Sequence, residues 1–448
     1  MTINAFTLKE LRQLARTKSI AVSLIAFLFV ALVIAYAVPV FFGMRQNTGE
    51  TMFIGINYLL ILMLCVVLPS EVFSFLDRER GSAKEHADFT MLTALPPSEV
   101  IDGKLRGAFA LMALFSTAAL PFGVLAYLMH GITFLRMLRF LVLTLCASCM
   151  ITHIVLAIAA MKIPRIIRRC MYALFMLVVI IFSLIGIFEI GAYSIADRLK
   201  AFWEVIAMTI TVCMIARGFA ISFFAPVVME RDLALRLTML AAVLGWLAFI
   251  LVSNLPDAAA SLWLSVTIVS SLVLAMYSMA QPLGYSRRML ASRPRNLILR
   301  GIMFPFSSAA VNGFVFACIL GAIGVGAEEI FIRPTLQTVQ WGSATFLMYV
   351  FSVLLFSRWV WRIFFSRRFS PVLVPLLSLA LFLFLQTIPP YIGLNGDVAE
   401  FNATPFYCPG ILAAPATHLF QAAIAFSISF GINFITSIIA TIIRNRRK

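Results

Sequence analysis

Long apolar runs recur along the whole chain and constrain its fold more than any other feature. A helix needs about 20 apolar residues to cross a bilayer. Only 12% of these residues are charged, against about 25% in water-soluble domains. The runs are continuous rather than alternating, which favours membrane-spanning helices over a β-barrel. We therefore predict an all-α polytopic membrane protein with about twelve transmembrane helices. The predicted spans lie near 19–43, 52–76, 105–129, 134–161, 170–192, 201–225, 234–254, 261–283, 301–325, 337–361, 371–393 and 417–443.

The basic residues are distributed unevenly between the loops that separate these spans. With the N-terminus in the cytoplasm, 28 of the 35 Lys and Arg residues fall on the cytoplasmic side and six fall outside. Because short cytoplasmic loops retain basic residues, we predict an even number of spans with both termini in the cytoplasm. This topology accounts for the formal net charge of +16, so no nucleic-acid partner is expected.

A short charged segment, residues 1–18, precedes the first span. Thr7 and Glu10 form the T-x-x-E pattern of a helix capping box, and apolar residues recur on one side of the segment. We predict an amphipathic helix on the inner membrane surface, in contact with anionic lipid headgroups. The alternative is an ordinary solvated start to the first span. The charged residues of this interfacial helix are Lys9, Glu10, Arg12 and Arg16.

The polar segment between the second and third spans carries the clearest local signals. Ser82 and Glu85 form another capping-box pattern, which predicts a helix that ends near residue 94. Pro96 and Pro97 stop that helix, because proline lacks the amide donor and clashes with the preceding turn. We expect Ser98 to cap a second helix, which becomes the third span. A structured cytoplasmic element of this kind suits contact with a protein partner.

The same segment resembles a known family of membrane proteins. The succession E-R-G-S, M-L-T-A-L-P and P-S-E-V-I-D-G-K-L is similar to the pattern in permease subunits of the type-2 ABC exporter family. The resemblance implies a permease driven by a separate ATPase, with this segment as the coupling helix that docks on it. The resemblance covers roughly residues 5–130. The chain departs from the family pattern in two ways: it contains the insert AKEHADF, and it has twelve predicted spans where six are common. The residues that the resemblance assigns to coupling are Glu79, Arg80, Gly81, Glu85, Phe89, Leu92, Leu95, Pro96, Glu99, Gly103 and Lys104.

The resemblance also divides the chain and implies its partners. Residues 19–228 form a predicted first half of six spans that resembles the exporter permease, whereas hydropathy alone assigns six spans to 229–448. The implied partners are ABC ATPase subunits and membrane lipids, with a second permease, identical or different, as a dimer partner. The implied location is an inner membrane of bacterial type.

Nucleotide chemistry is not expected on this chain. A P-loop needs the pattern G-x-x-x-x-G-K-[ST], and Gly103-Lys104 has neither the upstream glycine nor the following Ser or Thr. We therefore expect a transport subunit that is not itself an enzyme and carries no cofactor. ATP and Mg²⁺ are expected on the partner ATPase.

Two cysteines and a histidine on the fourth span form a candidate metal site. Cys146, Cys149 and His153 occupy positions i, i+3 and i+7, which share one helical face. Two thiols and an imidazole suit a soft cation such as Zn²⁺ or Cu⁺. Small residues packed at a helix interface, with a hydrogen-bonded histidine, explain the same pattern. We expect no bound metal, and the seven scattered cysteines indicate no disulfide framework.

Two other classes of protein remain as alternatives to an exporter permease. Twelve predicted spans also suit a secondary transporter. Glu328, Glu329 and Arg333 match E-E-x-x-x-R, which resembles the first motif of CAAX-type intramembrane proteases. That family also needs later histidine motifs, and here His418 is followed at i+4 by Ala422.

Ionisable residues inside membrane spans are candidates for function. Glu71, Glu204 and Arg217 are the strongest ones here, and each lies near a span end, where pairing or snorkelling explains it. Interhelical hydrogen bonds are expected from Asn57, Asn312 and Asn433.

Overall fold

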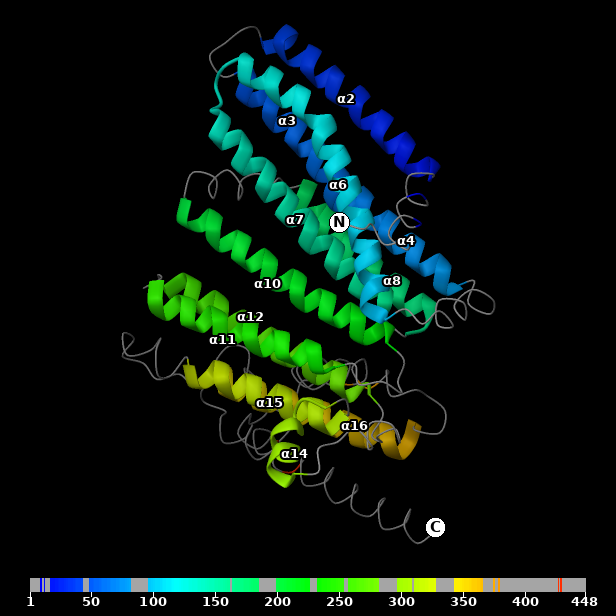
Figure 1. Ribbon diagram of the computed structural model, residues 1–448, viewed down its shortest axis with the longest axis vertical. Coiled ribbons are helices and arrows are strands. Elements are labelled where there is room, and N and C mark those ends of the chain that lie inside the picture. Colours follow the sequence, from blue (N-terminus) through cyan, green and yellow to red (C-terminus); the bar gives the residue numbers. More distant parts are fainter. Residues whose placement is uncertain are drawn as a thin grey trace, which may run out of the picture. The chain divides into compact units, whose positions relative to one another are not determined.

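In the computed structural model the described residues form a series of helices (Figure 1). It divides into two compact units, Met1–Pro226 and Val227–Lys448, which we describe separately. The described residues are 9, 12, 17–42, 48–81, 96–161, 163–184, 199–225, 232–253, 257–281, 296–307, 310–327, 342–365, 374, 378, 426 and 428.

The first unit is a bundle of long apolar helices that pack side by side (Figure 1). Its second span is continuous from α3 through a π-helical segment, η1, into α4. Such single-turn π segments interrupt α-helices and are often found near functional sites. The elements are α2 (Lys18–Phe42), α3 (Thr48–Leu62), η1 (Met63–Val67), α4 (Leu68–Gly81), α6 (Pro97–Leu128), α7 (Phe134–Ala160), α8 (Arg165–Leu184) and α10 (Leu199–Phe224).

The start of α6 differs from the prediction that Ser98 caps this helix. The helix begins at Pro97, and the residue before it, Pro96, has extended backbone angles (φ −64°, ψ 144°). The backbone N–H of Glu99 donates to the Pro96 carbonyl at 3.0 Å. Proline is favoured at the first helical position, because its fixed φ suits the helix and that position needs no amide donor. The two prolines therefore start α6 themselves.

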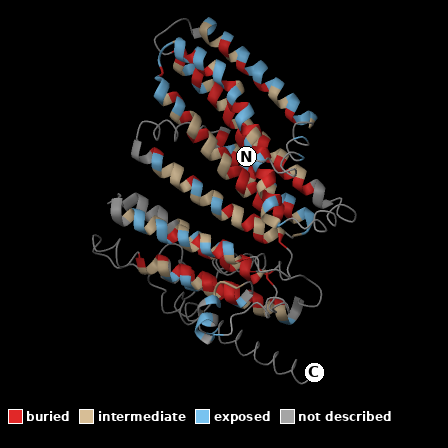
Figure 2. Ribbon diagram, in the orientation of Figure 1, coloured by how far each residue is buried: buried red, intermediate tan, exposed pale blue. Residues whose placement is uncertain are grey.

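Packing in the first unit leaves one side of α2 apolar and exposed. Figure 2 shows α2 mostly exposed, whereas buried residues gather where α3, α6 and α7 meet. The Phe53 and Phe140 rings meet edge to face, with centroids 5.8 Å apart, across the α3–α7 contact. At Gly49 a side chain would collide with the carbonyl oxygens of Ala126 and His130. Exposed apolar residues on a bundle of this composition suit contact with lipid.

The second unit contains five described α-helices and one π-helical segment. Its elements are α11 (Leu233–Ser253), α12 (Asp257–Met279), α14 (Leu297–Met303), α15 (Ala310–Ala327), α16 (Gly342–Val360) and a π-helical segment, η4 (Trp361–Phe365). The predicted ninth span, 301–325, is not one helix: the break between α14 and α15 includes Pro305, which cannot continue the backbone hydrogen bonds. The Arg236 side chain of α11 donates to the carbonyls of Pro305, at 2.7 Å, and Ser307. These bonds connect α11 to the break between α14 and α15.

The described residues support a multi-pass membrane protein, although twelve spans are not shown. Six helical segments are long and apolar enough to cross a membrane, at Lys18–Phe41, Thr48–Asp77, Pro97–Leu128, Phe134–Ala160, Phe202–Phe224 and Leu233–Ile250. Val266–Met279 and Val311–Ala327 are shorter apolar helices. The predicted spans 371–393 and 417–443 fall almost wholly outside the described residues.

Candidate functional site

The predicted coupling residues lie on both sides of a segment that the structure does not describe. Glu79, Arg80 and Gly81 form the end of α4, and Pro96 precedes α6. The first turns of α6 carry Glu99, Gly103 and Lys104. The other four predicted residues, Glu85, Phe89, Leu92 and Leu95, are outside the described residues.

Asp77, near the end of α4, is held by three arginines at the start of α8. Its carboxylate accepts hydrogen bonds from Arg165 Nε at 3.2 Å, Arg169 Nε at 3.0 Å and Arg168 Nη2. Asp77 and Arg168 are both buried, whereas Arg165 and Arg169 are about half exposed. Pairing removes the cost of leaving a lone charge in an apolar bundle. This ion-pair cluster therefore fixes the end of α4, just before residues 82–95, to α8.

Asp102, in the second turn of α6, is joined to α10. Arg217 Nε and Nη2 donate to the two carboxylate oxygens of Asp102, each at 2.6 Å. Two parallel bonds between a guanidinium and a carboxylate define orientation as well as distance. Of the two explanations expected for Arg217, pairing or snorkelling, the structure shows pairing, and the partner Asp102 follows residues 82–95 whereas Asp77 precedes them.

Lys104 lies against the helix that precedes the coupling segment. Its side chain is only 4% exposed, and Nζ lies 4.4 Å from the ring centroid of Phe75 on α4. A cation over an aromatic face is attracted to it, more strongly where water is excluded. The described residues on the two sides of 82–95 thus contact each other, and they also contact α8 and α10.

The predicted interfacial helix is described at only two of its charged positions. Lys9 and Arg12 are helical and exposed, and Glu10 and Arg16 are outside the described residues. Just beyond this segment, the Ser19 hydroxyl of α2 donates to Glu71 of α4. The start of the first span is therefore tied to the second span on the same side of the unit as Asp77.

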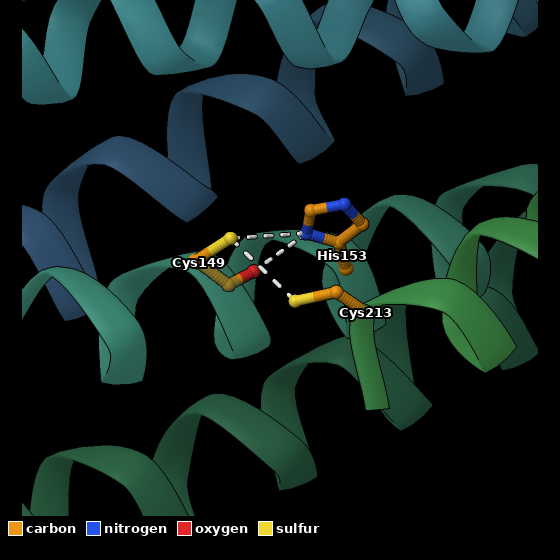
Figure 3. Close-up of side chains that lie close together, drawn as sticks. All are labelled: Cys149, His153 and Cys213. Carbon is orange, nitrogen blue, oxygen red and sulfur yellow. Dashed lines mark hydrogen bonds between the residues drawn. The ribbon is translucent and has the colours of Figure 1, made fainter. Parts of the chain in front are cut away.

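The predicted metal site is corrected in one of its three members. Cys149 and His153 of α7 meet Cys213 of α10, and one ligand atom from each lies within 4.8 Å of the others (Figure 3). Cys146 is not part of this group and interacts with Thr209 instead. The i+3 spacing puts Cys146 on the same broad face, but α10 covers that face and supplies its own thiol.

The geometry of this thiol–imidazole cluster favours packing over metal binding. The Cys149 and Cys213 sulfurs are 3.5 Å apart and His153 Nδ1 lies 3.7 Å from the Cys149 sulfur, near the spacing of about 3.8 Å that two thiolates take around tetrahedral Zn²⁺. However, Nδ1 also lies 2.7 Å from the Cys149 carbonyl oxygen. A carbonyl only accepts, so Nδ1 carries the proton and donates it there. A metal at this position would have to replace that bond.

The remaining predicted polar residues divide between described and undescribed parts of the chain. Thr144 of α7 donates to Asn57 of α3 at 3.2 Å, which confirms an interhelical bond for Asn57. Asn312 bonds instead to Ser307, in the break before α15. The protease-like residues Glu328, Glu329, Arg333 and His418, as well as Asn433, are outside the described residues.

Sequence reasoning missed Asp77 and its three arginines as a site. The signals that could have identified them are an acidic residue at the end of span two and a basic cluster directly after span four.

Comparison of the chain with protein-family models, with curated proteins and with solved structures finds no match.

Proposed function

We propose that this protein is the membrane subunit of an ATP-driven exporter of the ABC type, acting with separate ATPase subunits. The observation that carries the proposal is the coupling-type motif at residues 79–104, whose two flanks are joined to neighbouring helices by Asp77 and Asp102. In this proposal the membrane is an inner membrane of bacterial type, and both termini and the coupling segment face the cytoplasm.

The proposed mechanism transfers movement from the ATPase into the membrane helices. ATP binding on the partner shifts the segment between α4 and α6, and the paired flanks make α4, α6, α8 and α10 respond together. The buried Asp77–Arg168 pair, the partly exposed Asp102–Arg217 pair and the contact of Lys104 with Phe75 support such transfer, because each fixes the distance between two helices. ATP, Mg²⁺ and hydrolysis all belong to the partner chain.

A secondary transporter is the main rival for this chain. An ion-coupled carrier generally places ionisable groups where the substrate crosses the middle of the membrane. Asp77 and Asp102 are instead paired near the ends of their helices, which favours the exporter. A secondary transporter would keep its activity without ATP, whereas the proposed exporter would lose it.

A co-purification experiment tests the proposal. The full-length chain, tagged at its C-terminus, is purified from its native membranes in mild detergent, and mass spectrometry identifies any protein with a P-loop. We expect a P-loop ATPase in near-stoichiometric amount. Leu92→Asp should reduce the ATPase by at least tenfold, because a charge in an apolar contact costs several kcal/mol.

Matched controls separate a lost contact from a lost fold. Leu92→Met conserves size and apolar character and should leave the ATPase in place. Replacement of residues 84–95 by a Gly-Ser linker of equal length should abolish binding, while the thermal unfolding of the membrane chain stays unchanged. The proposal fails if wild type brings down no ATPase, or if both disruptive variants retain it.

A further inference from the structure

One buried arginine of the second unit differs from the other buried arginines in the described part of the chain. Arg168 and Arg236 form ion pairs with aspartates. Arg358, near the end of α16, is 6% exposed, and its Nη2 donates to the backbone carbonyl of Gln281 at 3.0 Å. Its Nη1 is buried and has no hydrogen-bond partner among the described residues. An anion beside Arg358 would remove the cost of this unpaired buried charge.

Carboxylates are scarce at this end of the second unit. Asp257 begins α12, whereas Gln281 follows the last residue of that helix, so the two are separated by about 35 Å at a rise of 1.5 Å per residue. The sequence has no acidic residue at 258–327, at 342–396 or at 401–448. Asp232 is therefore the acidic residue that the structure describes near Gln281.

Asp232 is already occupied by other partners. It pairs with Arg236 at 3.3 Å and accepts hydrogen bonds from Tyr277 at 2.7 Å and from Gln281 Nε2 at 2.8 Å. Because a carboxylate only accepts, the last bond fixes which end of the Gln281 amide faces Asp232. Gln281 Oε1 is then a buried acceptor that has no partner among the described residues.

Further donors lie one turn beyond Arg358. Trp361 begins the π-helical segment η4, and its Nε1 is buried without a hydrogen-bond partner in the described chain. Arg362 follows at i+4 from Arg358 and adds a second positive charge. Positions i, i+3 and i+4 are neighbours on one helix face, and indole and guanidinium groups only donate. This face therefore offers two positive charges and several N–H groups to one acceptor.

We propose that Arg358, Trp361 and Arg362, together with Gln281, form a binding site for a phosphate group. Arginine suits phosphate because its planar fork of N–H groups matches the phosphate oxygens. Gln281 Oε1 can accept a bond from a hydroxyl, such as that of a phosphate monoester or a glycerol headgroup. The predicted topology puts this end of α16 at the cytoplasmic surface, which both soluble phosphate and lipid headgroups reach. The site does not depend on the proposed ATPase partner.

Phosphate binding to the purified membrane chain tests the proposal. The full-length chain is held in an uncharged detergent, and its thermal unfolding is followed as sodium phosphate replaces sodium chloride at constant ionic strength. We expect the unfolding midpoint to rise with phosphate, because a ligand that binds only the folded chain stabilises it. Arg358→Gln should raise the dissociation constant about tenfold or more, as the loss of a hydrogen bond to a charged group does.

A second measurement distinguishes the two sources of the phosphate group. The chain is incubated with equal amounts of phosphatidylglycerol and phosphatidylcholine, and native mass spectrometry identifies the lipid that stays bound. Retention of phosphatidylglycerol by wild type and its loss from Arg358→Gln would assign the group to a lipid. A midpoint that rises with inorganic phosphate, without a retained lipid, would assign it to a soluble phosphate.

Control variants keep the proposal open to contradiction. Trp361→Phe keeps an aromatic ring and removes the indole donor, so it should weaken binding less than Arg358→Gln. Arg106→Gln removes an exposed arginine of α6 and should leave binding unchanged. Equal effects of Arg358→Gln and Arg106→Gln would show a response to overall charge and overturn the proposal.

Two further results would also overturn it. A wild-type chain that neither responds to phosphate nor retains phosphatidylglycerol would show that Arg358 is neutralised within the chain or by water. If Arg358→Gln does not fold, Trp361→Phe decides, and unchanged binding in that variant contradicts the site. All of these measurements use the membrane chain alone, so their failure leaves the proposed function standing.

Discussion

Arg217 and Asp102 form a two-bond ion pair in which Nε and Nη2 each lie 2.6 Å from a carboxylate oxygen. They are far apart in sequence, and the pair connects the cytoplasmic end predicted for α10 to the first turns of α6. Asp77 and Lys104 also make contacts between helices, and these connections can be tested one at a time.

Removal of the Asp102–Arg217 pair should destabilise the protein modestly. The Arg217 side chain is 41% exposed, and exposed pairs contribute about 1 kcal/mol or less. We expect Arg217→Ala to cost about 1 kcal/mol of unfolding free energy, measured by denaturant unfolding in detergent. The exchanged pair, Asp102→Arg with Arg217→Asp, should recover at least half of that loss. A swapped variant no better than the sum of its single changes would contradict the pairing.

Loss of Asp77 should have a larger effect than loss of its exposed partners. Asp77→Ala leaves the buried Arg168 guanidinium without its carboxylate, and breaking a buried pair costs about 3–5 kcal/mol. Arg165 and Arg169 are 48% and 55% exposed, so alanine at either should cost about 1 kcal/mol or less. Thermal unfolding of the three variants under one condition measures the order. Equal effects for Asp77→Ala and Arg169→Ala would show that Arg168 is not the main partner.

A methyl group at Gly313 should disrupt the second unit. A Cβ there would collide with Ser278 Oγ and lie 2.7 Å from Arg236 Nη2, beside the arginine that donates to the break before α15. We expect Gly313→Ala to cost about 1–3 kcal/mol, as overpacking does. Gly326→Ala in the same helix is the control, because nothing lies within 4 Å of a Cβ there, and it should be neutral or stabilising.

Mild oxidation should join α7 to α10. The sulfurs of Cys149 and Cys213 are 3.5 Å apart, so copper(II)–phenanthroline should take two electrons from the thiols, with release of two protons, to form a disulfide. Peptide mapping should find this bond in wild type and in Cys146→Ser, and not in Cys213→Ser. A disulfide from Cys146 to Cys213 in place of it would contradict the packing of α7 on α10.

Cobalt(II) should not bind tightly to the same cluster. The Nδ1 proton of His153 is donated to the Cys149 carbonyl, so the imidazole offers no lone pair toward the thiols. We expect no thiolate-to-cobalt charge-transfer absorption when cobalt is added to the purified chain. A strong band that persists in Cys146→Ser and disappears in Cys149→Ser, Cys213→Ser and His153→Ala would reverse this conclusion and establish a metal site.

The fold class could be predicted from the sequence because each apolar run specifies one helix and each basic loop specifies the orientation of the helices beside it, without reference to the rest of the fold. A run near 105–129 must become a helix wherever it lies, since its backbone groups cannot pair with lipid. For the same reason the sequence identified Arg217 as a charge that needed a partner. The choice of Asp102 as that partner depends on which helices pack together, and no local pattern contains that information.

Predictions from local sequence patterns were wrong where neighbouring residues offered a different solution. Ser98 has the right chemistry for a helix cap, but the proline pair beside it already provides the geometry of a helix start. The spacing of Cys146, Cys149 and His153 identified one side of α7, and the thiol that completes the cluster, Cys213, comes from α10. A uniform apolar run across 301–325 concealed the break at Pro305, where Arg236 of α11 donates to the carbonyls of Pro305 and Ser307.

The sequence by itself determined that this chain is a multi-pass helical membrane protein, with a polar segment that contains two prolines before its third predicted span. Hydrophobicity and proline chemistry are properties of single segments, so they can be read without the fold. Only the tertiary structure decided that Asp77 of α4 pairs with α8 and that Asp102 of α6 pairs with α10. Those relationships connect residues far apart in the chain, and they exist only because helix packing brings the residues within hydrogen-bonding distance.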